Sequence, residues 1–272
     1  MSKDNPQQSR LAEYAFGDSD AAAARLAAVN RVFESPYRSL LEAVNLPPIV
    51  DLAVDIGCGP GYTTELLRTA VNPRSLAGID ISPSFIARAR ANPSGSTAWF
   101  IHDVTTVPFP TDPADLLHAR WVLAHLHDPQ TVLASWLTQL RPGGTLLIQE
   151  DDSISSDTPL LSTYQCISDS LVAHRGGDLY VGRLLGQTAI PPPYELTLNR
   201  IYDHDVPAPT VAGIYGMNLA VWRTDLWIQR QHSPDALNEL AHNLSRIAHS
   251  DDPGKTTFSI RQIAITHTPR PH

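Results

Sequence analysis

The sequence predicts an α/β protein built on a doubly wound, mostly parallel β-sheet. Three observations predict this fold. A short apolar strand at 52–56 runs into the glycine-rich turn Gly57–Gly61, and a helix follows at once. From residue 50 to residue 151, apolar strands alternate with helical segments, as in βαβ units. Acidic residues follow several of these strands, at the edge where open α/β sheets bind their ligands.

Length and composition limit the class of protein. The chain has 272 residues, of which 42% are hydrophobic, enough for one large domain or a domain with a sizeable insertion. The net charge of −8 argues against a nucleic-acid partner. The sequence has no run of about 18 apolar residues and no apolar signal region at its N-terminus, so we expect a cytoplasmic protein that does not enter a membrane. The cysteines, Cys58 and Cys166, lack metal-ligand spacing, and no metal is expected.

Two helices are predicted between residues 19 and 45. Asp18, Ser19 or Asp20 can cap the first helix, and Pro36 opens the second. These helices either cover the sheet or, together with Tyr14 and Phe16, close over the ligand. The first helix can also pack on a second copy of the chain, so a homo-oligomer through the N-terminal helices is one expectation.

The glycine spacing indicates which ligand the turn accepts. Dinucleotide-binding turns have glycines at positions one, three and six. Here the glycines are Gly57, Gly59 and Gly61, at positions one, three and five, and Tyr62 occupies position six. Asp55 stands two residues before the first glycine. The turn therefore favours a small ligand that lies against bare backbone at the start of a helix, with no pyrophosphate to hold.

The next two strands also end in acidic residues. The strand at 76–81 ends in Asp80 and Ile81, and a carboxylate at this position can accept hydrogen bonds from ribose hydroxyls. Ser82 or Ser84 can cap the helix at 85–91. The strand at 98–101 is followed by Asp103 and Val104, and a dinucleotide enzyme has less reason for an acid there.

The segment 115–127 gives a fourth strand and the loop after it. Because ligands bind at the carboxyl ends of parallel strands, Arg120, Trp121 and His125 should face the crevice. A helix at 132–140, a glycine pair and a fifth strand at 145–149 follow, and Glu150 and Asp151 then face the same crevice. The remaining chain predicts helices within 158–189, a strand at 194–206, an aromatic helix containing Tyr215, a helix at 234–248 and a last strand at 256–266.

Several of these motifs occur together in one known family. The order D-x-G-x-G-x-G, the Asp-Val pair after the third strand, the run from Arg120 to Leu126 and the sequence LRPGGTLLI resemble class I S-adenosylmethionine-dependent methyltransferases of the ubiquinone and trans-aconitate type. The resemblance covers residues 50–151. It implies a Rossmann-like seven-stranded sheet of order 3-2-1-4-5-7-6 whose last strand is antiparallel. It divides the chain into an N-terminal helical cover (1–48), a cofactor-binding core (49–151), an acceptor-binding helical insertion with the sixth strand (152–235) and a closing helix and strand (236–272).

The resemblance also implies the cofactor, S-adenosylmethionine, with S-adenosylhomocysteine as the product. Asp80 would accept from both ribose hydroxyls, the Asp103 side chain would meet the adenine amino group, and the Val104 amide would meet a ring nitrogen. The expected cofactor residues are Tyr14, Asp55, Gly57, Gly59, Gly61, Asp80, Ile81, Asp103, Val104 and Arg120.

Methyl transfer needs alignment and exclusion of water, and a base only where the acceptor must lose a proton. His125 is the first candidate base, and Tyr215 is a second if carbon accepts the methyl group. The apolar, aromatic later segments suggest a small, fairly hydrophobic acceptor, methylated on oxygen or carbon rather than nitrogen, in bacterial secondary metabolism. The alternatives are a methyltransferase fold repurposed for another reaction and an NAD-dependent oxidoreductase.

Overall fold

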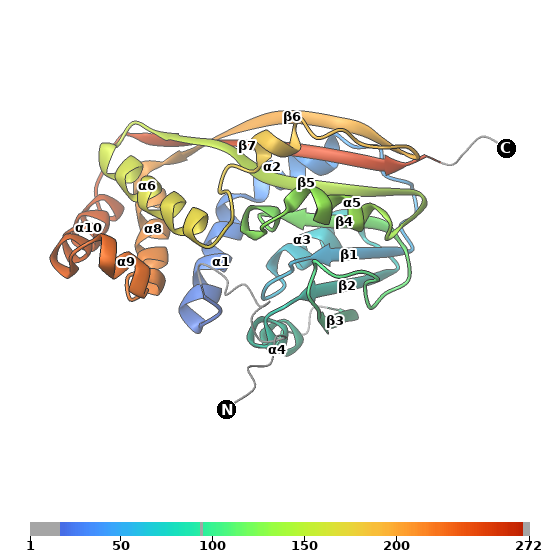
Figure 1. Ribbon diagram of the computed structural model, residues 1–272, viewed down its shortest axis with the longest axis horizontal. Helices are drawn as coiled ribbons and strands as arrows, with labels where there is room; N and C mark the ends of the chain where they lie inside the picture. The colour runs from blue at the N-terminus through green and yellow to red at the C-terminus, as the bar shows by residue number, and fades with distance from the viewer. Residues whose placement is uncertain (1–16, 93–94, 269–272) are drawn as a thin grey trace, which may run out of the picture.

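The computed structural model describes residues 17–92 and 95–268 (Figure 1). Its strands form one seven-stranded sheet of order β3-β2-β1-β4-β5-β7-β6, in which β7 runs antiparallel to both of its neighbours. The predicted fold class and strand order are therefore confirmed. The strands are β1 Leu52–Ile56, β2 Ser75–Asp80, β3 Thr97–Ile101, β4 Ala114–Arg120, β5 Leu140–Ser156, β6 Tyr194–Pro207 and β7 Lys255–His267.

Helices cover both faces of the sheet and form a further layer at one end of it (Figure 1). The predicted caps at Ser19 and Ser82 are present, and each accepts a hydrogen bond from the first turn of the helix that follows, as Asp128 does for α5. The helices are α1 Asp20–Val32, α2 Glu34–Glu42, α3 Tyr62–Val71, α4 Pro83–Ala91, α5 Pro129–Leu137, α6 Pro159–His174, α7 Gly182–Leu185, α8 Ala208–Trp222, α9 Leu226–Gln231 and α10 Pro234–Ala248, with a short 3-10 helix, η2, at Leu123–His125.

The central strands are apolar on both sides because both of their faces are buried. Val54 and Ile56 of β1 pack with α5, whereas Ala53 packs on the opposite face with α2 and α3. A third hydrophobic cluster joins α1, α6, α8, α9 and α10 over the outer halves of β6 and β7. In this cluster α10 packs on α8, so the C-terminal helix belongs with the predicted insertion and not with the central core.

The largest difference from the predicted elements is the length of β5. The sequence predicts a strand at 145–149, but β5 runs from Leu140 to Ser156. It continues because β7 pairs with it as far as Ser156, opposite Thr256. The predicted insertion therefore begins inside a strand. Within the described ranges, no helix has the length and apolar character needed to span a membrane.

Candidate active site

The glycine turn after β1 has a backbone that side chains cannot easily adopt. Gly57, Gly59 and Gly61 have φ angles of +65°, +53° and +89°. A Cβ atom on Gly57 would lie 2.5 Å from Val122, and one on Gly61 would lie 2.7 Å from Trp99. Glycine is therefore required both for the angles and for the close packing. The turn leaves bare backbone at the N-terminus of α3, where a polar ligand is favoured.

Asp80 joins the second strand to this turn. Its Oδ2 accepts a hydrogen bond from the Gly59 N–H at 2.8 Å, and its Oδ1 accepts one from the Ser82 N–H at 2.8 Å. Burial raises the pKa of the Asp80 carboxyl, and these two N–H donors oppose the shift. Each carboxylate oxygen has a second lone pair, so Asp80 can still accept hydrogen bonds from a ligand. Ile81, the residue between Asp80 and Ser82, is half-buried.

The third acidic position lies one strand further along the same edge. The His102 N–H donates to the Asp80 carbonyl at 2.9 Å, so the ends of β2 and β3 are adjacent. Asp103 Oδ1 accepts from the Thr105 N–H at 2.9 Å and from its hydroxyl at 2.7 Å. Val104 is buried, and its carbonyl accepts from the Trp136 indole at 2.8 Å. The residues predicted for the ribose and the adenine therefore line one continuous sheet edge.

Asp55 lies below the turn, inside the protein. Its Oδ2 accepts from the hydroxyls of Thr63 (2.9 Å) and Thr64 (2.6 Å), and its Oδ1 accepts from His118 Nδ1 (2.8 Å). Asp55 was predicted to bind the cofactor, but this geometry favours a positioning role, in which it ties the start of α3 to β1 and β4. His118 was missed, although a histidine within the apolar strand DLLHAR is a visible signal.

The first helix lies over this edge. Leu26 of α1 is the nearest side chain above Gly59, where a Cβ atom on the glycine would lie 3.7 Å from it. Arg120, at the end of β4, donates from Nη2 to Asn30 Oδ1 of α1 at 2.6 Å, and its guanidinium lies 4.9 Å from the Trp121 ring. Burial lowers the pKa of Arg120 to about 10. Helix α1 thus lies beside this edge, where a cover over the ligand is one of the two predictions for it; that role stays a prediction, and Tyr14 and Phe16 lie outside the described residues.

The loop after β4 is held in a strained conformation. Trp121 has a φ angle of +54°, which is unusual for a bulky side chain and is common at functional sites. Glu150 holds the next residues, because its Oε1 accepts from the Val122 and Leu123 N–H groups, both at 2.7 Å. Glu150 is fully buried, and burial raises its pKa to about 8 against the opposing effect of these donors. Glu150 is therefore a positioning residue for the loop that carries His125.

The two candidate catalytic residues have different surroundings. Burial, Arg25 and Arg175 lower the pKa of His125 to about 4, so its imidazole is neutral at pH 7 but is a weak base. Tyr215 stacks on Tyr164 with ring centroids 3.9 Å apart, and its hydroxyl donates to Gln165 Oε1 at 2.6 Å. Burial raises the pKa of the Tyr215 hydroxyl well above its usual value. Both catalytic roles stay predictions. The buried, stacked ring of Tyr215 has the surroundings of a packing residue.

Comparison with known proteins gives a consistent result. Residues 54–148 match a family described as a methyltransferase domain. The trans-aconitate 2-methyltransferase of Methylobacterium radiotolerans is 32% identical over 173 residues, which are 64% of this chain and 60% of that protein. A second such enzyme, from Rhizobium rhizogenes, is 32% identical over 46% of this chain and 48% of its own length. The chain therefore spans about half to three fifths of these two relatives.

Solved structures support the fold over almost the whole chain. The plantazolicin methyltransferase BpumL, solved in complex with S-adenosylhomocysteine, is 12% identical, covers 95% of this chain and 94% of its own, and superposes with a TM-score of 0.55. The matched domain, the strand order and the glycine turn with its neighbouring acids agree: residues 54–148 belong to a methyltransferase-domain family, and the seven-stranded sheet is that of the class I S-adenosylmethionine-dependent methyltransferases.

Proposed function

We propose that this protein transfers a methyl group from S-adenosylmethionine to a small-molecule acceptor. The observation that carries the proposal is the 2.8 Å hydrogen bond from Gly59 to Asp80, which joins a carboxylate to the positive-φ turn at the start of α3. Bare backbone suits the amino-acid part of the cofactor, and Asp80 suits the two ribose hydroxyls. When bound, the cofactor supplies a methyl group on a positively charged sulfur.

Different residues of the chain would bind different parts of the cofactor or hold the residues that do. Asp80 would hold the ribose, and Asp103 and the Val104 amide would hold the adenine. Asp55 keeps the turn in place through Thr63 and Thr64, and Arg120 links the end of β4 to α1. The cover formed by α1 would exclude water from the reacting groups, which methyl transfer requires.

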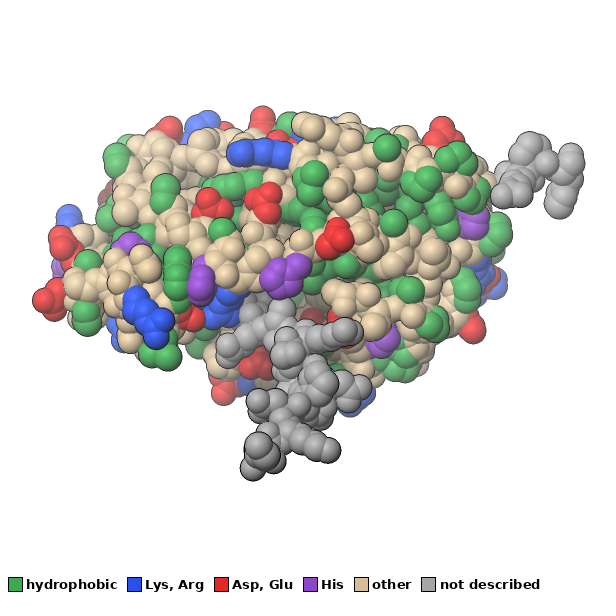
Figure 2. All heavy atoms as spheres, in the orientation of Figure 1, with side chains coloured by type: hydrophobic (Ala, Val, Ile, Leu, Met, Phe, Trp, Pro, Cys, Tyr) green, Lys and Arg blue, Asp and Glu red, His purple; other side chains and the backbone are tan. Residues whose placement is uncertain are grey.

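For the acceptor we propose a small, fairly hydrophobic molecule, methylated on oxygen or carbon. The support is the aromatic character of the hydrophobic cluster formed by α1, α6, α8, α9 and α10: Tyr164, Tyr215 and Trp222 are buried in it, and Trp121, directly after β4, packs against it. On the face shown in Figure 2, Lys and Arg side chains are scattered singly, which suits a small molecule better than a nucleic acid. A role in bacterial secondary metabolism, a cytoplasmic location and a homo-oligomer through the N-terminal helices remain part of the proposal.

A carboxylate-bearing acceptor is the second candidate. The relatives named trans-aconitate 2-methyltransferases favour it, and so do the positive charges of Arg25 and Arg175 beside His125. Arg175 also pairs with Asp225 at 2.7 Å, so part of its charge is already balanced. An anionic acceptor would be attracted by the positive charge of Arg25 and Arg175 beside His125 that the Arg175–Asp225 ion pair does not balance.

Calorimetry followed by a product assay tests the proposal. We expect binding of S-adenosylmethionine and S-adenosylhomocysteine, and no binding of NADH. The assay then measures S-adenosylhomocysteine release with trans-aconitate and with a panel of phenols and indoles. Binding of NADH alone would favour the oxidoreductase, and cofactor binding without product from any acceptor would favour a repurposed fold.

A further inference from the structure

The carboxyl end of β5 contains an irregularity next to the crevice. Asp151 lies opposite Ile260 of β7, and Ser153 lies opposite Ser259, so Asp152 is an extra residue on this strand. Such a β-bulge changes the direction of the neighbouring side chains and is common beside active sites.

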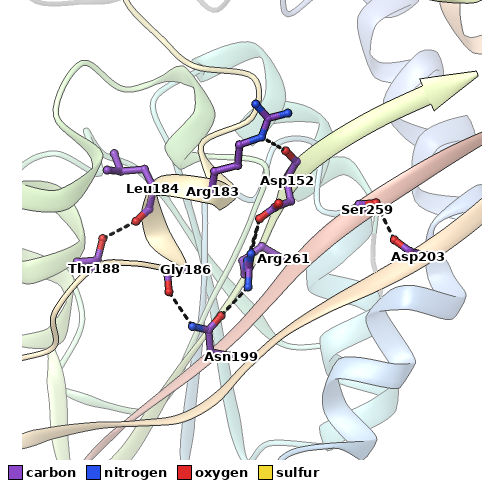
Figure 3. A network of polar contacts seen from close by, with 9 residues as sticks. All are labelled: Asp152, Arg183, Leu184, Gly186, Thr188, Asn199, Asp203, Ser259 and Arg261. Carbon is purple, nitrogen blue, oxygen red and sulfur yellow. Dashed lines mark hydrogen bonds and ion pairs between the residues drawn. The ribbon is translucent and has the colours of Figure 1, made fainter.

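Asp152 holds the bulge through its side chain and its backbone (Figure 3). Its Oδ1 accepts from Arg261 Nε at 2.9 Å and Nη2 at 2.6 Å, and its carbonyl accepts from Arg183 Nε at 2.6 Å. Arg261 also donates to Asn199 Oδ1 at 3.0 Å, which links β7 to β6. A Cβ atom on Gly182 would lie 2.7 Å from the Asp151 carbonyl, so α7 packs directly on this backbone. The bulge is therefore rigid.

The Asp151 carboxyl, in contrast, has one oxygen, Oδ1, without a hydrogen-bond partner among the described residues. Asp151 is only 7% exposed, and its Oδ1 accepts no hydrogen bond from any residue that the structure describes. The indole N–H of Trp121 interacts with this carboxyl and opposes the rise of its pKa, although the contact is weaker than the other hydrogen bonds of the described residues. Buried polar atoms in native proteins are almost always paired, so the unpaired Oδ1 points to a ligand.

Two tyrosine hydroxyls and one carboxyl lie close enough to Asp151 for its charge to raise their pKa values: those of Tyr180, Tyr215 and Glu150. The two tyrosines, but not Asp151 itself, line a hollow of about 120 Å³. That hollow is too small to hold a whole drug-sized ligand, which needs roughly 300 Å³ or more, but it provides space beside the aromatic rings. Burial raises the pKa of Asp151 to about 7, which suits a group that accepts a proton near neutral pH.

We propose that Asp151 is the polar anchor of the acceptor site, and that its Oδ1 accepts the hydrogen bond and then the proton of a phenol-type hydroxyl on a flat, apolar acceptor. The inference rests on the proposed function and names the acceptor class for it. The acceptor oxygen bonds to the methyl carbon, the carbon–sulfur bond of the donor sulfonium breaks with its electron pair on sulfur, and the hydroxyl proton moves to Asp151. This assigns the proton transfer to Asp151 in preference to His125 or Tyr215.

The test compares two probes on the full chain loaded with S-adenosylhomocysteine at pH 8.5, where Asp151 is ionised. The probes are 2-naphthol and 2-methoxynaphthalene, which differ in the hydroxyl proton. Calorimetry or ligand-observed NMR should show that the wild type binds 2-naphthol about tenfold or more tightly than its ether. Asp151→Leu should remove this preference. In the wild type, the preference for 2-naphthol should weaken below about pH 7, where Asp151 becomes protonated. Asp151→Asn should keep part of the preference, and that part should not change with pH.

The controls separate a binding role from a structural one. Asp169→Asn, which removes a carboxylate from α6, should keep the preference for 2-naphthol. Asp151→Leu should unfold at the wild-type temperature or above, because it removes a buried carboxyl that has an unpaired oxygen; if it does not fold, Asp151→Asn carries the test. Equal affinity of the two probes, no binding of either, or an unchanged preference in the Asp151 variants would overturn the inference. Failure to bind S-adenosylhomocysteine, measured first, would instead overturn the proposed function.

Discussion

Asp80 is the residue on which cofactor affinity should depend most. Its carboxylate holds the glycine turn and has further lone pairs at the position proposed for the ribose. Asp80→Ala should therefore weaken binding of S-adenosylhomocysteine by about 1–3 kcal/mol, roughly ten- to a hundredfold, as measured by calorimetry. Asp112→Ala, at a position away from this edge, is the control. Unchanged affinity in Asp80→Ala would remove the ribose assignment.

Substitution of Asp55 should lower the free energy of unfolding more than it lowers cofactor affinity. Asp55→Ala would leave three donors, on Thr63, Thr64 and His118, without their common acceptor in a buried place. We expect a loss of about 3 kcal/mol in the free energy of unfolding, measured by urea denaturation, because each unsatisfied buried donor is costly. Thr63→Val removes one donor and should cost about 1 kcal/mol. A stable Asp55→Ala protein with reduced cofactor affinity would mean that Asp55 contacts the ligand directly.

At the scale of elements, the junction between α6 and the loop after β4 should tolerate little change. Gly176 has a φ angle of +83°, and an added Cβ would lie 2.0 Å from the His127 ring. Gly176→Ala should therefore destabilise the protein by about 1–3 kcal/mol. Gly213 on α8 is a matched control with nothing within 4 Å, so Gly213→Ala should stabilise by about 0.5–1 kcal/mol. Thermal unfolding measures both variants, and equal effects would contradict this packing.

Elements set by local sequence could be predicted well, and those set by distant pairing could not. The turn after β1 and the cap at Ser82 depend on neighbouring residues, and the structure has both where they were expected. The end of β5 at Ser156 depends on a partner about a hundred residues away in β7. The same pairing creates the bulge at Asp152, for which residues 150–153 contain no local signal.

At the scale of the whole molecule, the candidate site shows the same division. Asp80 and Asp103 follow strands directly, so their place on the sheet edge could be read from strand ends. The contact of Arg120 with Asn30 joins residues from β4 and α1 and required the folded chain. The unpaired Oδ1 of Asp151 depends on burial in the folded chain, where α7 packs on the Asp151 backbone, and no sequence motif records this.

The buried titratable groups also give the whole molecule a pH-dependent stability. Burial raises the pKa of Glu150 to about 8 and of Asp151 to about 7, so the folded protein holds these protons more tightly than the unfolded chain. Their contribution to stability is present at low pH and is lost as the pH rises toward 8. His125 acts in the opposite direction, because its pKa falls from 6.5 to about 4 on folding, so its contribution is lost as the pH falls through that range. Above pH 6.5, the stability therefore changes mainly through the two carboxyls.

The free energy of unfolding should therefore fall by about 2 kcal/mol between pH 6.5 and pH 8, since one pKa unit corresponds to about 1.4 kcal/mol. Glu150→Gln keeps the buried shape without the charge and should remove most of this decline, so that the variant gains stability relative to the wild type as the pH rises. Glu239→Gln, on the exposed side of α10, should follow the wild-type profile. Urea denaturation at several pH values in this window measures all three proteins. A wild-type stability that is constant or rises between pH 6.5 and pH 8 would contradict this, because it would mean that Glu150 is already ionised in the folded protein at neutral pH. The Val122 and Leu123 N–H groups would then donate to a charged carboxylate.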